Sequence, residues 1–219
     1  MLDFILFIFY HKLKDFFTGG KMQNFLDLIQ KRRSIYHLNR KTDISLKEII
    51  KTVETCLKYT PTAFNSQTGR IVILFHEPYL SFWNSTKKTL KKITSPEKFE
   101  QTKEKIDSFK KGIGTILFFE EQHTLEALEE KFTLYKDNFQ IWSNQSSGML
   151  QYAVWLALAE LNLGANLQHY NPLVDEYIYQ TFNLPQSWKL MAQMNFGGIQ
   201  KEADEKTFLD INKRLHVFK

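Results

Sequence analysis

The stretch Pro61-Thr62-Ala63-Phe64-Asn65-Ser66-Gln67-Thr68-Gly69-Arg70 lies between a strongly patterned helix and an apolar run, Ile71-Val72-Ile73-Leu74-Phe75. Proline ends the helix because its ring fixes φ and removes a hydrogen-bond donor. The polar side chains that follow are those of Thr62, Asn65, Ser66 and Gln67. Hydroxyl and carboxamide groups both donate and accept hydrogen bonds. This loop therefore suits a flat heterocycle with alternating N–H and C=O groups, although Asn, Ser and Gly also favour ordinary turns.

The segments on either side of this loop are predicted from their patterns. Ser45 and Glu48 form a capping box. The apolar residues that follow have the spacing of one buried helical face: Leu46, Ile49, Ile50, Val53 and Leu57. After the loop, the continuously apolar residues 71–75 predict a strand that is buried on both faces.

Upstream, Lys31-Arg32-Arg33-Ser34-Ile35-Tyr36 ends another helical pattern, in which Phe25, Leu28 and Ile29 recur at helical spacing. A guanidinium group binds phosphate or carbonyl oxygens through forked, charge-assisted hydrogen bonds. A basic helix C-terminus is also favoured by the helix macrodipole. The residues alone leave both interpretations open.

The rest of the chain alternates between lysine-rich helices and apolar strands. Residues 78–111 read as helical surface, with a restart at Ser95-Pro96-Glu97, where a cap, a proline and an acid follow one another. Strands are expected at Thr115–Phe119 and Trp188–Phe196, and the longest helix at 138–162. Gly164 is expected to cap the end of that helix.

Five glutamates follow the strand at Thr115–Phe119, and we expect them to form an acidic, solvated patch on a helix: Glu120, Glu121, Glu126, Glu129 and Glu130. This group lacks the His or Cys companions of a transition-metal site, so no metal is expected. The sequence also has no Gly-x-Gly-x-x-Gly fingerprint and no phosphate-binding P-loop.

Three segments in order resemble the nitroreductase family, the FMN-dependent oxidoreductases: Arg32-Arg33-Ser34, Pro61-Thr62-x-x-Asn65-x-Gln67 and Leu163–Pro172. The third resembles a subgroup related to fungal fatty-acid-repression nitroreductases. The resemblance extends from about Met22 to the C-terminus. It implies an α+β fold with a central mixed or antiparallel sheet flanked by helices. It also implies a long helix in a homodimer interface and a C-terminal strand, near 213–218, exchanged between subunits.

The resemblance also implies a set of cofactor-binding residues. Arg32, Arg33 and Ser34 would contact the FMN phosphate, ribityl chain and ring, Asn65 and Gln67 the ring and ribityl chain, and Lys206 the phosphate. Thr62 and Tyr36 are weaker matches, and Lys213 and Arg214 are alternatives to Lys206. Gln168, His169 and Tyr170 would pass along the ring, mainly through their backbone. A lone histidine such as His169 is by default a packing or hydrogen-bonding residue.

The implied activity is reduction of nitroaromatics, quinones or related small acceptors, with NADPH or NADH as reductant. FMN would lie at the subunit interface of a homodimer, and the mechanism would be ping-pong with hydride transfer. Flavin N5 would carry the chemistry, so no catalytic side chain is expected. The alternative is a flavin- or lipid-responsive regulatory protein that binds without turnover.

Composition sets broader limits. The chain has 219 residues and a mass of 26.0 kDa, which fits one domain at 22–219. Residues 1–21 read as an extension, either a mis-called start or an amphipathic anchor, and the apolar run at 4–10 is too short to span a bilayer. The net charge of +5 comes from dispersed lysines, so no nucleic acid or membrane partner is expected. The single cysteine, Cys56, fits a reducing cytoplasm.

Overall fold

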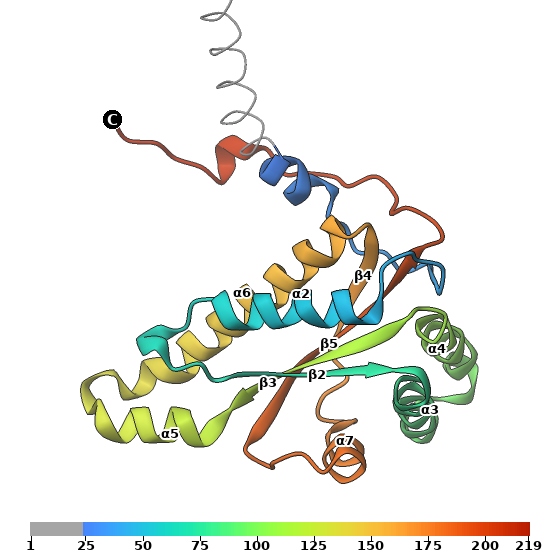
Figure 1. The fold of residues 1–219 in the computed structure, drawn as a ribbon, viewed down its shortest axis with the longest axis horizontal. Coiled ribbons are helices and arrows are strands. Elements are labelled where there is room, and N and C mark those ends of the chain that lie inside the picture. The colour runs from blue at the N-terminus through green and yellow to red at the C-terminus, as the bar shows by residue number, and fades with distance from the viewer. Residues whose placement is uncertain (1–23) are drawn as a thin grey trace, which may run out of the picture.

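The computed structural model describes residues 24–219 as one α+β unit (Figure 1). The expected extension at 1–21 lies outside the described residues. The strands are β1 (Leu38–Asn39), β2 (Gly69–Phe75), β3 (Gly114–Glu121), β4 (Leu163–Gln168) and β5 (Trp188–Ile199). Their order is β1-β5-β3-β2, with β4 also paired to β5. All of these strand pairs are antiparallel, which confirms the expected fold class.

Helices cover both faces of the sheet (Figure 1). The α-helices comprise a helix at 24–31, α2 (Leu46–Tyr59), α3 (His76–Ile93), α4 (Pro96–Phe109), α5 (Gln122–Lys131), α6 (Lys136–Glu160) and α7 (Asp175–Phe182). Short 3₁₀ turns lie at η1 (Ala63–Asn65), η2 (Thr133–Tyr135) and η3 (Ile211–Lys213). One face carries α2 and α6, and the other carries α3, α4 and α7. In the described part, no helix has the length and apolar character to cross a membrane.

Two apolar cores lie against the two faces of the sheet. The first joins Ile49 and Val53 of α2 to Val154 and Leu158 of α6. The second is built around Trp83 of α3, whose indole N–H donates to Thr115 Oγ1 at 2.8 Å. The expectation that 78–111 forms only surface is therefore wrong, because α3 and α4 each bury one face. Helical spacing places five buried side chains of α3 on that face: Tyr79, Phe82, Trp83, Thr86 and Leu90.

Two further expectations need correction. Strand β2 lies at an edge of the sheet, so its residues are mostly half-buried, and Leu74 alone among them is fully buried. Gly164 lies inside β4 and caps no helix, because the chain reverses after α6 at Asn162, whose φ is 57°. A Cβ on Gly164 would lie 2.9 Å from Ile35 Cβ, so glycine permits β4 to approach the 34–35 segment.

The C-terminal tail runs away from the sheet (Figure 1). Within the described chain, residues 214–219 form no strand. Several of the tail's large apolar side chains are exposed: Phe208, Leu209, Ile211, Leu215, Val217 and Phe218. A strand exchanged with a second subunit remains a prediction.

The acidic patch expected after β3 divides into two parts. Glu120 and Glu121 end β3 and are buried, at 2% and 8% exposure, so the expectation of a solvated face is wrong for them. Strand β3 is buried along its whole length, including its last residue, and polar groups from other elements donate hydrogen bonds to both carboxyl groups. Glu126 and Glu130 lie exposed on α5, as expected, and Glu129 is half-buried there.

Glu121 has a clear structural role as the N-cap of α5. Its carboxylate accepts hydrogen bonds from the backbone N–H groups of His123 (3.2 Å) and Thr124 (2.7 Å). Burial alone would raise the pKa of Glu121. Hydrogen bonds from Thr124, Ser187 and His123 outweigh that effect and lower the pKa to about 2.

We expect Glu121→Ala to lower the free energy of unfolding by roughly 1–2 kcal/mol at pH 7, the usual cost of losing a cap. A carboxyl group whose pKa is lower in the folded state than in the unfolded state stabilises the fold at pH values above its unfolded-state pKa. This contribution is lost as the pH falls from the ordinary value of 4.5 towards about 2. Urea unfolding of wild type and variant at pH 7 and pH 3 measures the difference between their free energies of unfolding, which should be smaller at pH 3. Glu126→Ala, at an exposed position on the same helix, is the matched control. If the difference in free energy of unfolding between wild type and Glu121→Ala were the same at both pH values, the role of the Glu121 carboxylate as the N-cap would be contradicted.

Candidate functional site

The loop at 62–67 is held in shape by its own hydrogen bonds. The backbone N–H of Asn65 donates to Thr62 O at 3.0 Å, and that of Gln67 donates to Thr62 Oγ1 at 3.0 Å. The Arg70 guanidinium donates to the carbonyls of Gln67 (2.7 Å) and Gly69 (2.9 Å). Thr62 therefore caps the loop that presents Asn65 and Gln67, and Arg70 closes its far end.

The backbone of this loop is strained. Phe64, Asn65 and Gln67 have φ values of 56°, 51° and 49°, in the left-handed region that non-glycine residues rarely adopt. Each such residue costs on the order of 1–2 kcal/mol. Strain of this kind persists only where surrounding contacts fix the conformation, and it gathers at functional sites.

Aromatic contacts anchor the loop at one end. The ring of Phe64 lies 4.9 Å from that of Phe132, 5.4 Å from Phe139 and 6.0 Å from Trp142, measured between centroids. Phe64 nevertheless remains 50% exposed. The loop therefore presents an aromatic face next to its carboxamides.

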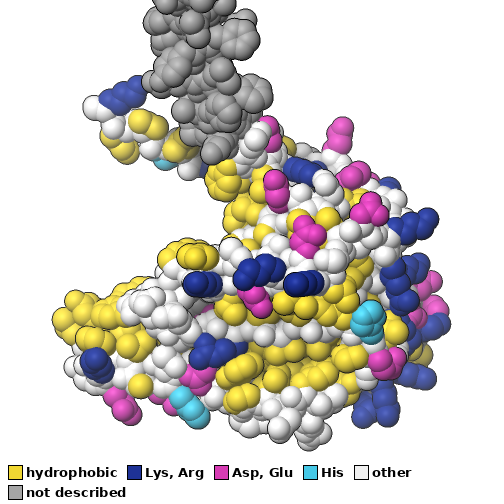
Figure 2. All heavy atoms as spheres, in the orientation of Figure 1, with side chains coloured by type: hydrophobic (Ala, Val, Ile, Leu, Met, Phe, Trp, Pro, Cys, Tyr) yellow, Lys and Arg dark blue, Asp and Glu magenta, His cyan; other side chains and the backbone are white. Residues whose placement is uncertain are grey.

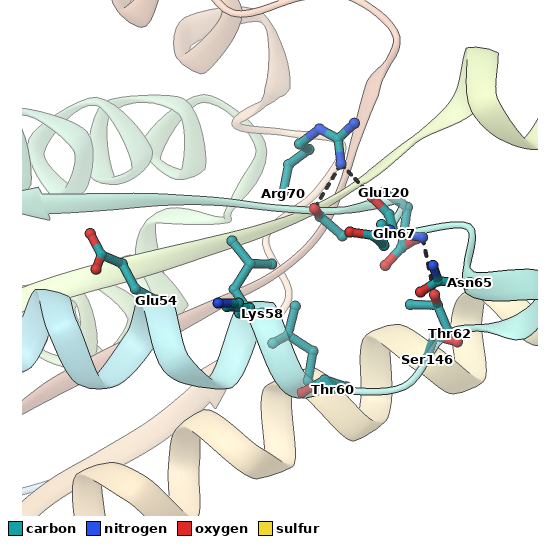
Figure 3. A pocket seen from close by; sticks show the side chains of 12 residues that line it. Glu54, Lys58, Thr60, Thr62, Asn65, Gln67, Arg70, Glu120 and Ser146 are labelled. Carbon is teal, nitrogen blue, oxygen red and sulfur yellow. Dashed lines mark hydrogen bonds between the residues drawn. The ribbon is translucent and has the colours of Figure 1, made fainter.

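A cavity of about 360 Å³ opens beside the loop, between the end of α2, the start of β2 and α6 (Figure 3). We call it the loop cavity. Of the residues expected at the site, Thr62, Asn65 and Gln67 line it. Other lining residues are Glu54, Lys58, Thr60, Gly69, Arg70, Glu120 and Ser146, with Leu57 and Leu150 as apolar wall.

A second cavity, of about 350 Å³, forms around the arginine–serine triplet, and we call it the basic cavity. It joins the segment after the 24–31 helix to the segment after β5. Arg32, Arg33, Ser34, Tyr36 and Lys206 line it, together with His37, Lys201, Glu202, Ala203 and Asp204. Four basic and two acidic side chains give the cavity lining a net positive charge. The structure thus brings together residues that are far apart in the sequence, and their role in binding an anion stays a prediction.

The two arginines are held differently. Arg33 donates from Nη2 to the carbonyl of Asp204 at 2.6 Å, which ties the triplet to the C-terminal segment. The Arg32 guanidinium lies 4.5 Å from the centroid of the Trp155 ring. Its Nε is buried and has no hydrogen-bond partner among the described residues. A buried donor without a partner is costly, so a ligand or a further chain is the natural acceptor.

The loop cavity and the basic cavity share no lining residue in the described chain. One chain therefore does not bring the triplet and the loop carboxamides into one cavity.

The third predicted segment lines neither cavity. Gln168 is buried, and its amide donates to Asn166 Oδ1 at 3.0 Å, whereas His169 is exposed. Tyr170 packs its ring against Trp83 and Phe109 in the second core. Burial raises the pKa of Tyr170 to about 12, so its phenol stays neutral near pH 7. A role for this segment through its backbone remains a prediction.

Sequence reasoning missed a buried polar network beneath the site. Thr115 Oγ1 donates to Asn195 Oδ1 at 2.7 Å, and Asn195 donates to Asn166 Oδ1 at 3.3 Å. Asn166 in turn donates to the carbonyl of Ile35 at 2.8 Å, directly after Ser34. The network ties the triplet to the sheet. Polar residues inside apolar strands are the signal that could have revealed it.

Sequence reasoning also misplaced Glu120, which lines the loop cavity as a buried carboxyl group. Among the described residues, no group of three or more His, Cys, Asp or Glu side chains is placed to hold a metal ion.

The comparisons with known proteins agree with this fold, which defines an oxidoreductase of the nitroreductase type. The chain belongs to the Nitroreductase family, whose sequence model matches residues 29–198. It is 32% identical over 197 residues to nitroreductase FRM2 of Saccharomyces cerevisiae, covering 89% of this chain and 97% of that protein. The expected likeness to fungal members is confirmed.

Solved structures give the same result. Nitroreductase CinD from Lactococcus lactis, solved in complex with chloramphenicol, is 45% identical with a TM-score of 0.82, covering 89% of this chain and 100% of that one. The same enzyme has been solved with 4-nitrophenol. A putative nitroreductase from Desulfovibrio desulfuricans, solved in complex with FMN, shares the fold at 14% identity and a TM-score of 0.64, covering 88% of this chain and 95% of that one.

Proposed function

We propose that the protein is an NAD(P)H-dependent FMN oxidoreductase that reduces nitroaromatic, quinone or related small acceptors. The observation that carries the proposal is the basic cavity, where the triplet Arg32-Arg33-Ser34 meets Lys206 from the other end of the chain. Guanidinium, hydroxyl and ammonium groups together suit a phosphate monoester.

The residues present fit FMN. Arg32 has a buried Nε without a hydrogen-bond partner in the described chain. Arg33 donates one hydrogen bond, from Nη2 to the carbonyl of Asp204. Ser34 and Lys206 add a hydroxyl and an ammonium group to the same lining. The FMN bound to the Desulfovibrio desulfuricans protein supports the choice of cofactor. In this proposal these residues hold the phosphate and ribityl chain.

We propose a homodimer as the working form, with FMN at the interface between subunits. The triplet and the loop carboxamides line separate cavities in one chain, so a second copy is needed to unite them. Exposed apolar side chains support an interface along α6: Ile141, Met149 and Tyr152. Apolar surface also gathers at the tip formed by α5, η2 and the start of α6, where Leu134 is 83% exposed (Figure 2).

The proposed reaction is ping-pong. NADH or NADPH binds, is oxidised and leaves, and the acceptor then enters the same site. FMN, when bound, supplies the hydride-carrying ring that links the two halves. The protein's own residues bind and orient: the triplet and Lys206 hold the phosphate, while Asn65 and Gln67 contact the ring or ribityl chain. No side-chain nucleophile is required. The single Cys56, half-buried on α2, is compatible with the cytoplasmic location that we propose.

An aromatic acceptor is supported by the loop itself. Phe64 is half exposed and lies among Phe132, Tyr135, Phe139 and Trp142. Stacked or tilted ring contacts are worth about 0.5–1.5 kcal/mol beyond the area they bury. The complex of CinD with 4-nitrophenol, a nitro-substituted ring, points to the same class of acceptor.

The test is an absorption spectrum of the purified protein after incubation with FMN, followed by anaerobic addition of NADPH or NADH. We expect a bound flavin spectrum that bleaches with the reductant and recovers on adding 4-nitrophenol or a quinone. A protein that stays colourless overturns the proposal. A flavin that binds but is not reoxidised by any small acceptor supports a regulatory binding protein instead.

A further inference from the structure

We propose that Glu120 is a positioning residue that clamps the strained loop at 62–67 in its ligand-binding shape, through Thr68 on one side and Ser143 on the other. The value of this clamp for FMN binding rests on the proposed function. The clamp itself is a property of the chain without any ligand.

The geometry of the clamp is specific. Glu120 Oε2 accepts a hydrogen bond from Thr68 Oγ1 at 2.5 Å and another from Ser143 Oγ at 2.8 Å. Thr68 is fully buried and directly follows Gln67, the last residue of the loop. Ser143 lies on α6, so one carboxylate oxygen joins the loop, β3 and the longest helix.

The second oxygen of the carboxyl group is left for the cavity. Neither hydrogen bond to the Glu120 side chain uses Oε1, and Glu120 lines the loop cavity beside Asn65 and Gln67. Figure 3 places Glu120 next to Gln67 and below Arg70. The clamp therefore lies beside the carboxamides that it would position.

The loop needs a clamp because its backbone is strained at Phe64, Asn65 and Gln67. The ring contacts of Phe64 hold the first part, and Arg70 holds two carbonyls at the end. Glu120 fixes the side chain of Thr68, where the loop joins the sheet. Without this anchor, the strained residues are free to relax to more favourable φ values.

A carboxyl group at this depth is costly, which argues for a role beyond filling space. Burial raises the pKa of Glu120, while hydrogen bonds from Thr68 and Ser143 and the charge of Arg70 work in the opposite direction. An apolar residue of similar volume would avoid this cost. It would leave two buried hydroxyl groups without their acceptor.

The test measures loop order in the ligand-free protein and FMN affinity separately. Amide hydrogen exchange of Asn65, Ser66 and Gln67 reports the loop, because each of these N–H groups donates a hydrogen bond within it. We expect Glu120→Leu to speed exchange at these amides and to weaken FMN binding about tenfold or more. We expect Glu120→Gln to remain near wild type, since its carbonyl oxygen can accept both hydroxyl donors.

A second pair of variants separates the clamp from general destabilisation. Thr68→Val removes the hydroxyl group that donates to Glu120, while the side-chain volume stays nearly the same. Thr86→Val is the matched control, because buried Thr86 donates to Phe82 O within α3, in the second core. We expect Thr68→Val to speed exchange at the loop amides and weaken FMN binding, and Thr86→Val to do neither.

The outcomes are distinct. Unchanged loop exchange in Glu120→Leu and Thr68→Val overturns the clamp, as does equal exchange in Thr68→Val and Thr86→Val. If Glu120→Gln weakens FMN binding as much as Glu120→Leu, the charge and not the positioning matters, and the proposal fails. If wild type binds no FMN, the proposed function fails, but the exchange measurements still decide whether Glu120 orders the loop.

Discussion

Replacing Arg33 by alanine is expected to weaken FMN binding by roughly ten- to one-hundred-fold, because a charge-assisted hydrogen bond contributes about 1.5–3 kcal/mol. Arg33 lines the basic cavity, and its contact with the Asp204 carbonyl fixes the direction of the guanidinium. The measurement is fluorescence titration of the ligand-free protein with FMN, at low and moderate salt. Lysine at this position should restore only part of the affinity, since it lacks the planar fork of donors.

Arg40→Ala is the matched control for this experiment. Arg40 lies a few residues further along, near the surface, and donates weakly to Lys110 O at 3.4 Å, outside the basic cavity. Its loss should leave FMN affinity unchanged. Equal FMN affinity in Arg33→Ala and wild type, with both proteins folded, would show that the triplet does not hold the phosphate.

The second large effect is that FMN binding should be restored in heterodimers of two different variant chains. Chains carrying Arg33→Ala and chains carrying Asn65→Ala should each retain little FMN through purification when expressed alone, because each substitution weakens FMN binding. Co-expressed with different tags and purified as heterodimers, they should bind about one FMN per dimer. The reason is that Arg33 and Asn65 line separate cavities, so a site shared between subunits takes one residue from each chain. One of the two sites then carries both substitutions, and the other carries neither.

A heterodimer of Arg33→Ala with Lys206→Ala is the control for complementation. Both residues line the basic cavity of the same chain, so each of the two sites keeps one defect and no FMN should return. Absence of FMN from the heterodimer of Arg33→Ala with Asn65→Ala would mean that one chain supplies both residues. A monomer in sedimentation experiments would contradict the shared site directly.

Local patterns in the sequence predicted the elements that depend on neighbouring residues. The capping residue Ser45 accepts a hydrogen bond from the Glu48 backbone N–H at 3.2 Å, and α2 begins where expected. Pro96 opens α4, and the apolar run after Gly114 forms the fully buried strand β3. Caps, proline and apolar periodicity act within a few residues, so they can be read without the fold.

The burial of individual residues was less predictable, because it depends on the order of strands and on which helices cover each face. Residues 71–75 have the apolar pattern of a central strand, yet β2 lies at the edge of the sheet. Trp83 and Phe109 come from lysine-rich helices that read as surface, yet they build a core. The composition of a helix does not show which residues share a face, whereas burial depends on the one face that packs against the sheet.

Short-range patterns predicted the two binding motifs and the positions of most helices and strands, whereas the α+β class was implied by the resemblance to the nitroreductase family. Packing of distant segments places Arg33 against the segment near Lys206 and puts the triplet and the loop into separate cavities. It also placed Glu120 against Thr68, 52 residues away, and Ser143, 23 residues away. Contacts across such distances depend on how the whole chain packs, and no local pattern encodes them.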